Sequence, residues 1–292
     1  TMEDGALVAP LCKPGAHVRS RGGDFSAGRT LLAVGRVLDA AAVGLIAASG
    51  ASHLAVTRRP RLCILPNGDE LVRPGETPGP FQIFDAASYA IAALSRAWGA
   101  EAVISAPLAD APDAIADAAR PLLGQCDVLV VIGGASVGAH DHARSAPAQL
   151  GYTEHFGKIA VRPGKPTWFA TGPGALLVGL PGNPASALVC ARLFLAPMIE
   201  AMLSGNADAT LATVSAKLAA PFPANGAREH YLRAAITDSG AGERIAAIHA
   251  EQDSSLLSVF SLSNALVRRA ARAPALEAGA PVEALAMVRP TA

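Results

Sequence analysis

The sequence predicts an α/β fold, in which a parallel sheet lies between two layers of helices, followed by a small β-barrel. The first observation is the alternation of strand-like and helix-like segments between residues 58 and 134, which is typical of right-handed crossovers between parallel strands. The second is the change after Gly205 to short β-like runs separated by turn residues. The third is a glycine-rich beginning with one helix-like run, which predicts a small α/β segment. We therefore expect three parts, at residues 1–57, 58–205 and 206–292.

The composition supports a globular protein with a sizeable core. Of the 292 residues, 51% are hydrophobic and 16% are charged. The 24 Lys and Arg residues balance 24 Asp and Glu residues, so the net charge indicates neither a nucleic-acid nor a membrane partner. The four cysteines form no CxxC pair and are interpreted as buried, reduced thiols of a cytoplasmic protein. We expect no signal peptide, and no apolar run of the ~18 residues that a membrane span needs.

Each element is predicted from a local pattern of apolar residues and turn signals. The run at residues 126–134 is almost continuously Val, Ile and Leu, which indicates a strand buried on both faces. A very apolar helix at 183–205 is predicted to have Asn183 as N-cap and Pro184 as its first residue. In chain order, we predict strands within 13–35, a helix at 36–50, a strand at 61–69, a helix at 84–99, a strand at 101–108, a helix at 112–124, the strand at 126–134, strands at 158–171 and 174–184, the helix at 183–205, and β-like runs at 210–220, 230–237, 244–250, 264–270 and 281–288.

Acidic residues follow three strands of the predicted parallel sheet, where ligands bind beyond the carboxyl ends of the strands. Asp69 and Glu70 come after the first strand, Asp110 after the second and Asp141 after the third. We expect these carboxylates to converge on one edge of the sheet. Paired carboxylates suit Mg²⁺, which prefers hard oxygen ligands and often bridges to substrate phosphate.

A glycine-rich loop, GGASVG at residues 133–138, follows the third strand. Glycines let main-chain N–H groups approach an oxyanion, and Ser136 adds a hydroxyl. The alternative is a plain tight turn, because the loop lacks both the Gly-Lys-Ser/Thr of a Walker loop and the GxGxxG dinucleotide pattern. His140 and His142 flank Asp141, but no third ligand stands at a useful spacing, so we expect no metal site on the histidines.

Two further segments carry features of anion sites. VRPGKP places Arg162 and Lys165 around a Pro-Gly turn, and two such cations can clamp a small oxyanion. LPGNPAS, at 180–186, ends a strand and begins a helix whose free N–H groups attract anions. A solvated surface hairpin and ordinary helix capping are the alternative interpretations.

Taken in this order, PNGDELVRPG, IGGASVGAHD, VRPGKP and LPGNPAS resemble the molybdopterin molybdotransferase (molybdenum insertase) family, which includes the E domain of gephyrin. GAREHYLRA and QDSSLLSVFSLSNALVRR resemble the family's C-terminal β-barrel domain, and VRSRGGDFSAG resembles its entry segment. The resemblance implies a three-layer molybdopterin-binding domain with a parallel sheet, a small C-terminal β-barrel domain and a partial N-terminal α/β segment.

The resemblance also implies an activity: molybdate is inserted into adenylylated molybdopterin with release of AMP, assisted by Mg²⁺. It implies a cytoplasmic homodimer that works with molybdopterin adenylyltransferase. By motif position, it assigns binding of the pterin phosphate to Gly133, Gly134, Ser136 and Gly138, lined by Pro181 and Pro184. It assigns catalysis to Asp141, Asp110 and Glu70, and Mg²⁺ binding to Asp69, Glu70 and Asp141. Molybdate binding is assigned to Arg162, Lys165 and Ser186, with help from Arg233 and from Ser254 or Ser255.

Some residues depart from the family pattern. Asn67 stands where Thr is usual, and Ala86 and Ala87 follow Asp85 where an Asn is usual. The sequence opens at Thr1, already inside the family's N-terminal region, so we expect a truncated or shortened chain that lacks much of the surface through which the family dimerises. Two alternatives therefore stay open. One is a molybdopterin adenylyltransferase, which shares the glycine loop but normally lacks the β-barrel; the other is a non-catalytic molybdopterin-binding or scaffold protein.

Overall fold

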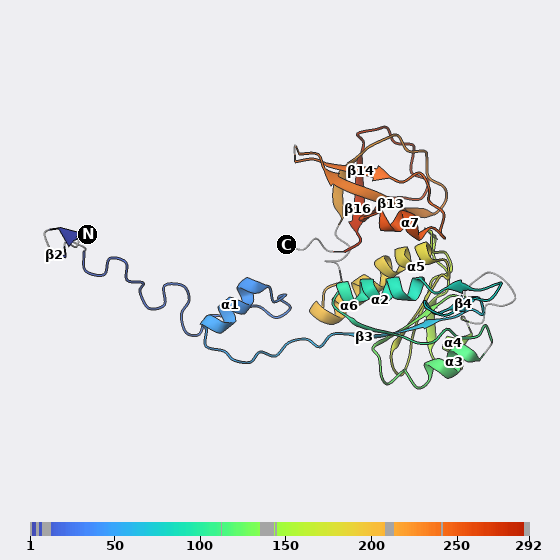
Figure 1. The fold of residues 1–292 in the computed structure, drawn as a ribbon, viewed down its shortest axis with the longest axis horizontal. Coiled ribbons are helices and arrows are strands. Elements are labelled where there is room, and N and C mark those ends of the chain that lie inside the picture. Colours follow the sequence, from blue (N-terminus) through green and yellow to red (C-terminus); the bar gives the residue numbers. More distant parts are fainter. Residues whose placement is uncertain are drawn as a thin grey trace. The chain divides into compact units, whose positions relative to one another are not determined.

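The computed structural model describes residues 2–3, 6–7, 13–111, 113–134, 143, 145–207, 213–240 and 242–288 (Figure 1). The chain divides into two compact units, Thr1–Val56 and Thr57–Ala292. The first unit holds two short antiparallel strands and one helix. These are β1 (Met2–Glu3), β2 (Ala6–Leu7) and α1 (Ala40–Ala48).

The first unit confirms the expected helix and corrects the expected strands. Helix α1 begins after Asp39, whose Oδ1 accepts the N–H of Ala42 at 2.8 Å, as an N-cap does. Residues 13–39 form turns and bends and contain no strand, so the strands predicted within 13–35 are wrong. The apolar side chains there, such as Val18 and Val34, are exposed. A strand in this segment would therefore bury no apolar face, and such burial is what stabilises short strands.

A six-stranded sheet forms the centre of the second unit, and the α/β prediction is confirmed. The strand order is β6-β3-β7-β11-β10-β8. The first four strands are parallel, and β10 runs antiparallel to both of its neighbours, β11 and β8, so β10 is the one reversed strand of this sheet. The strands are β3 (Arg61–Pro66), β6 (Glu101–Ile104), β7 (Val128–Ile132), β8 (Thr153–Phe156), β10 (Trp168–Thr171) and β11 (Leu176–Leu180).

Helices cover both faces of this sheet, which explains its nearly continuous apolar strands. In β7, Val130 packs with the helices on one face and Leu129 with those on the other. Ile64 and Leu65 of β3 divide in the same way because successive side chains of a strand point to opposite faces. One layer consists of α2 (Ala87–Ala97), α5 (Pro184–Cys190), the π-helix η2 (Ala191–Leu195) and α6 (Ala196–Ser204), and the other of α3 (Ala114–Ala119) and α4 (Ala146–Gln149) (Figure 1).

The elements α5, η2 and α6 form one helical run, Pro184–Ser204, with a mean hydropathy of 1.7. By length and composition this run could cross a membrane, so the expectation that no apolar segment reaches that length is wrong. In the structure, 61% of its most apolar window is buried inside the protein. Leu195 packs in the core between this run and the central sheet, and Val189 packs with Phe260 of the barrel part. A helix buried on several sides is apolar on several sides, which explains its hydropathy.

The C-terminal part is a closed barrel of five strands, as predicted. The strand order is β14-β12-β16-β15-β13, and β13 pairs with β14 to close it. The two-residue strand β9 (Val161–Arg162) adds to β13 in parallel, so a segment next to the central sheet becomes part of the barrel sheet. The barrel strands are β12 (Val214–Leu218), β13 (Glu229–Asp238), β14 (Arg244–Ile248), β15 (Ala265–Arg269) and β16 (Pro281–Ala286). Between β14 and β15, the helix α7 (Leu257–Ser261) follows a loop. Outside the barrel, β4 (Leu71–Val72) pairs with β5 (Ile83–Phe84).

Candidate functional site

One edge of the central sheet brings together most of the described site residues. The parallel strands β6, β3, β7 and β11 all end at this edge, and the antiparallel β10 begins there. The sheet order therefore fixes the order of the loops along the edge. From one end to the other they are Asp110 after β6, Asn67 and Asp69 after β3, Gly133 and Gly134 after β7, Pro181–Asn183 after β11, and Gly164 and Lys165 before β10.

The acidic end of this edge is organised by Asn67. Its side chain is 3% exposed, and its main-chain N–H donates to Ile132 O at 2.8 Å. Its Nδ2 lies 3.5 Å from Asp110 Oδ1, and the N–H of Asp110 donates to Asp69 Oδ1 at 3.1 Å. The structure thus brings Asn67, Asp69 and Asp110 together. The exposed carboxylate of Glu70 folds back against Gly68.

The oxygen chemistry of this end fits Mg²⁺, the ion that the family resemblance implies. Asn67 Oδ1 is buried and has no hydrogen-bond partner among the described residues. Together with the carboxylates of Asp69 and Asp110 it offers hard oxygen donors, which Mg²⁺ prefers. Across the described residues, no group of three or more His, Cys, Asp or Glu side chains could hold a metal; Asp141 lies outside those residues. These donors make a partial set that leaves positions for water and substrate oxygens.

The turn after β7 packs directly against Asn67. Gly133 and Gly134 have φ values of 91° and 68°, which favour glycine. A Cβ on Gly133 would overlap Asn67 O, and a Cβ on Gly134 would lie 2.7 Å from Asn67 Nδ2. Both glycines are therefore needed for this close approach. The other predicted loop residues, Ser136, Gly138 and Asp141, with His140 and His142, lie outside the described residues.

The start of α5 has the predicted N-cap position but a different hydrogen-bonding arrangement. Asn183 is the residue before the helix, yet its side chain caps no helical N–H. Its Nδ2 donates to Ser254 Oγ at 3.0 Å, and the N–H of Ala185 donates to Ser254 O at 3.0 Å. A carbonyl of the barrel part therefore accepts a hydrogen bond from one of the amides at the start of this helix. Ser186, at 4% exposure, and Pro181 are buried beside it.

The PGKP turn forms the basic end of the edge. Arg162 and Lys165 are exposed, and neither makes an ion pair with a carboxylate among the described residues. Gly164 has a φ of 125°, and a Cβ there would overlap Cys190 Sγ. Thr167 Oγ1 lies 2.8 Å from Gly164 O and 3.1 Å from Cys190 Sγ. Burial raises the pKa of Cys190 to about 12, so a neutral thiol supports the turn.

Arg233, the barrel residue that the family resemblance adds to the site, is buried against a loop of the barrel part. Its side chain is 2% exposed and donates to Leu256 O at 2.9 Å and to Asp253 O at 2.8 Å. Its guanidinium also lies 5.9 Å from the centre of the Phe260 ring. These contacts fix the loop that carries Ser254, so Arg233 stabilises the position of a predicted site residue. Ser255 is exposed.

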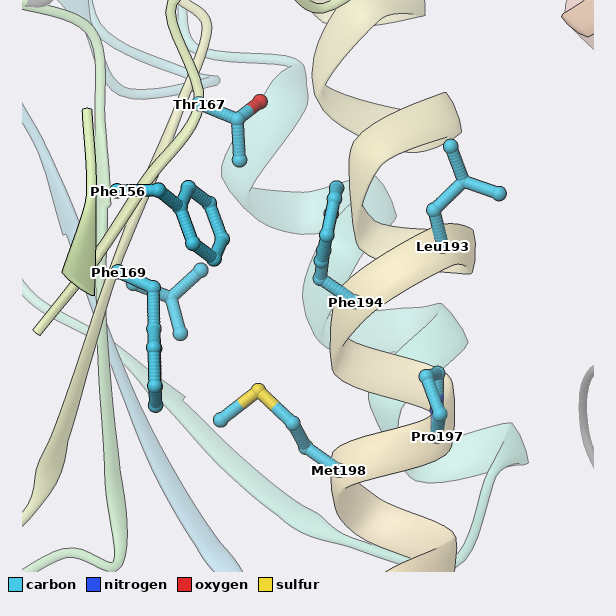
Figure 2. A pocket seen from close by; sticks show the side chains of 8 residues that line it. Phe156, Thr167, Phe169, Leu193, Phe194, Pro197 and Met198 are labelled. Atoms are coloured by element: carbon cyan, nitrogen blue, oxygen red, sulfur yellow. The ribbon is translucent and has the colours of Figure 1, made fainter. Parts of the chain in front are cut away.

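A separate apolar cavity of about 240 Å³ lies between the sheet and the long helix (Figure 2). Phe156 and Phe169 face Phe194 and Met198 across it, and Thr167 lies at one end. No lining side chain is charged, so the cavity does not suit a phosphate or an oxyanion. Its lining residues are Phe156, Thr167, Phe169, Val178, Leu193, Phe194, Pro197 and Met198.

Comparison with protein-family models identifies both parts of the second unit. Residues 63–201 match a probable molybdopterin binding domain, and residues 215–287 match the MoeA C-terminal region (domain IV). The chain belongs to the molybdopterin molybdenumtransferase family. The match over 215–287 covers the barrel, the part that an adenylyltransferase normally lacks, so it disfavours that alternative.

Individual relatives agree with this family. A molybdopterin molybdenumtransferase from Nostoc sp. is 38% identical over 191 residues, which are 64% of this chain and 44% of that protein. Molybdopterin molybdenumtransferase 2 from Mycobacterium tuberculosis is 33% identical over 82% of this chain and 60% of that protein. The molybdopterin biosynthesis MoeA protein from Pyrococcus horikoshii superposes with a TM-score of 0.79 at 25% identity, covering 91% of this chain and 64% of that one. The chain thus spans about half to two thirds of the length of these relatives.

Proposed function

We propose that this protein inserts molybdate into adenylylated molybdopterin, with release of AMP and assistance from Mg²⁺. The observation that carries the proposal is the order of charges along the sheet edge. Carboxylates stand at the β6 and β3 end, a glycine turn lies in the middle, and Arg162 and Lys165 stand at the β10 end. A substrate with a pyrophosphate at one end and an incoming oxyanion at the other matches this order.

Each end has a distinct task in this proposal. Asp69 and Asp110, with Glu70 and Asp141, orient the pyrophosphate; when bound, Mg²⁺ neutralises charge on its oxygens. The main chain of Gly133 and Gly134, continued by Ser136 and Gly138, approaches the pterin phosphate. Pro181 and Pro184 line this region. Arg162, Lys165 and Ser186 collect molybdate, because guanidinium and ammonium groups donate charge-assisted hydrogen bonds to oxyanions.

A non-catalytic binding protein was the alternative suggested by Ala86 and Ala87. In the structure, Ala87 is the first residue of α2 and is buried in the core, and Asp85 Oδ1 accepts the N–H of Ser88 at 3.1 Å. These departures therefore affect the start of a helix. The hydrogen bond from the Asp110 N–H to Asp69 Oδ1 does not involve Ala86 or Ala87, and this supports the enzyme.

The experiment mixes the purified full chain with adenylylated molybdopterin, molybdate and Mg²⁺, and follows AMP release. Release that depends on molybdate supports the proposal. Consumption of ATP with unmodified molybdopterin would indicate an adenylyltransferase, and pterin binding without turnover would indicate a binding protein. Asp69→Asn and Asp141→Ala should each abolish release, whereas Asp238→Asn, at the exposed far end of β13, should not.

Further elements of the proposal are a cytoplasmic location, a homodimer, and a direct supply of substrate by a molybdopterin adenylyltransferase. The family resemblance supports these three. Sedimentation equilibrium of the full chain measures the dimer. Co-purification with the adenylyltransferase, compared with an unrelated cytoplasmic enzyme, tests the partner.

A further inference from the structure

The apolar cavity beside the long helix has one wall made by the central sheet (Figure 2). Phe169 of β10 stands opposite Phe156 of β8 on one side and opposite Val178 of β11 on the other. Side chains of directly opposed residues point to the same face of a sheet. The three side chains therefore form a row across three strands, and this row is the sheet wall of the cavity.

The helix makes the facing wall at the place where it departs from a regular α-helix. Leu193 and Phe194 belong to the π-helix η2, and Pro197 and Met198 belong to the first turn of α6. π-helical turns are rare, and they occur frequently at functional sites. Pro197 has no N–H to donate within the helix. The cavity thus coincides with the irregular part of the helical run.

Three phenyl rings give the cavity an aromatic surface. The centre of the Phe156 ring lies 6.0 Å from that of Phe169 and 5.8 Å from that of Phe194, and both pairs are tilted. All three side chains are partly exposed, so solvent or a ligand can reach them. Aromatic rings prefer tilted or offset neighbours at such distances, so these rings favour another aromatic ring as a partner.

The lining offers a ligand neither a charge nor a free side-chain hydrogen-bonding group. Among the eight lining residues only Thr167 is polar, and its Oγ1 donates to Gly164 O at 2.8 Å. Figure 2 shows its methyl group, and not its hydroxyl, toward the phenyl rings. A charged molecule would lose its hydration here without gaining a partner. The chemistry of the lining therefore selects a neutral, apolar ligand.

The volume distinguishes a small molecule from a protein segment. The cavity holds about 240 Å³. An apolar cavity of about 150 Å³, engineered in another protein, stays dry and binds benzene. An α-helix is about 10 Å across and rises about 5.4 Å per turn, so a single helical turn already exceeds the volume of this cavity. The occupant that fits is therefore a molecule of one or two rings.

We propose that this cavity, here called the phenyl cavity, binds a neutral molecule of one or two aromatic rings. The site is separate from the charged sheet edge, and the inference does not depend on the proposed function. The phenyl cavity reaches that edge only at Thr167, whose hydroxyl bonds to Gly164 of the PGKP turn. An occupant would therefore contact a residue that supports this turn.

The test measures binding of naphthalene to the full chain by equilibrium dialysis, with 2-naphthoate as the charged analogue. Naphthalene has two fused rings and no polar atom, so it matches the lining. We expect one molecule of naphthalene to bind per chain. Binding of 2-naphthoate should be at least about tenfold weaker, because its carboxylate finds no counter-charge in the cavity.

Three variants locate the binding. Met198→Trp places a larger side chain between the helix and the sheet, and should weaken naphthalene binding at least about tenfold. Met202→Trp is the matched control: Met202 lies one turn later on α6 and packs against the same core without lining the cavity, so binding should not change. Phe194→Leu is the milder variant, and loss of its ring should weaken binding about 2- to 10-fold.

Each outcome decides the question. One-to-one binding that is lost in Met198→Trp, weakened in Phe194→Leu and kept in Met202→Trp supports the proposal. Equal binding of 2-naphthoate, an equal loss in Met202→Trp, or unchanged binding in both cavity variants overturns it. A wild-type chain that binds no naphthalene up to its solubility also overturns it. If Met198→Trp then lowers the fraction of dimer in sedimentation equilibrium, a side chain of a second copy occupies the cavity instead.

Discussion

Lowering the pH from 7 to 5 should destabilise the fold through His230. This side chain is buried in the barrel sheet, and burial together with Arg162, Arg228 and Arg233 lowers its pKa from 6.5 to about 4. Below pH 6.5 the unfolded chain takes up a proton at this imidazole, whereas the folded chain does so only near pH 4. The unfolded state therefore binds more protons in this window, and stability falls as the pH falls, levelling off below about 4.

The magnitude follows from the difference between the two pKa values. At roughly 1.36 kcal/mol per pH unit, the full window from 6.5 to about 4 corresponds to about 3 kcal/mol of unfolding free energy. About 2 kcal/mol of this should be lost by pH 5. Such a loss is a large fraction of the stability of an ordinary domain.

The assay is urea unfolding at pH 7 and pH 5, followed by circular dichroism, for wild type and His230→Gln. Glutamine does not titrate, so the free-energy difference between the two proteins should change by about 2 kcal/mol between the two pH values. Leu262→Gln, at an exposed position that ends α7, is the control; neither leucine nor glutamine titrates, so its difference from wild type should stay constant. A difference for His230→Gln that is the same at both pH values would refute the reasoning.

Three substitutions test the supports of the site. Gly133→Ala places a Cβ against Asn67 O and should lower AMP release more than about tenfold, with a reduced Tm; normal activity would contradict the close approach. Gly164→Ala should raise the KM for molybdate by displacing the turn from the Cys190 sulfur, and adding Cys190→Ala should restore part of it; no rescue would argue against this contact. Arg233→Met should cost about 2–4 kcal/mol in urea unfolding, because buried carbonyls lose their donors; a smaller loss would mean that water replaces the guanidinium.

Several elements follow from short stretches of sequence. The continuous apolar run of β7 predicts a strand buried on both faces, and Val130 and Leu129 pack on opposite layers as expected. Asn183 and Pro184 mark the start of α5 correctly. These features depend on neighbours a few residues away, so a single sequence carries them. The expected convergence of Asp69 and Asp110 also needed only the rule that parallel strands end at one edge.

The tertiary structure alone decided other features of the site. Nothing in residues 158–171 indicates that β9 leaves the central sheet to pair with β13, and only this pairing aligns Arg162 with His230. The same holds for Arg233, whose acceptors are carbonyls of a distant loop, and for Cys190 beneath the PGKP turn. Hydrophobic periodicity determines which face of an element is buried. It does not determine which distant segment covers that face, because that choice depends on the packing of the whole chain.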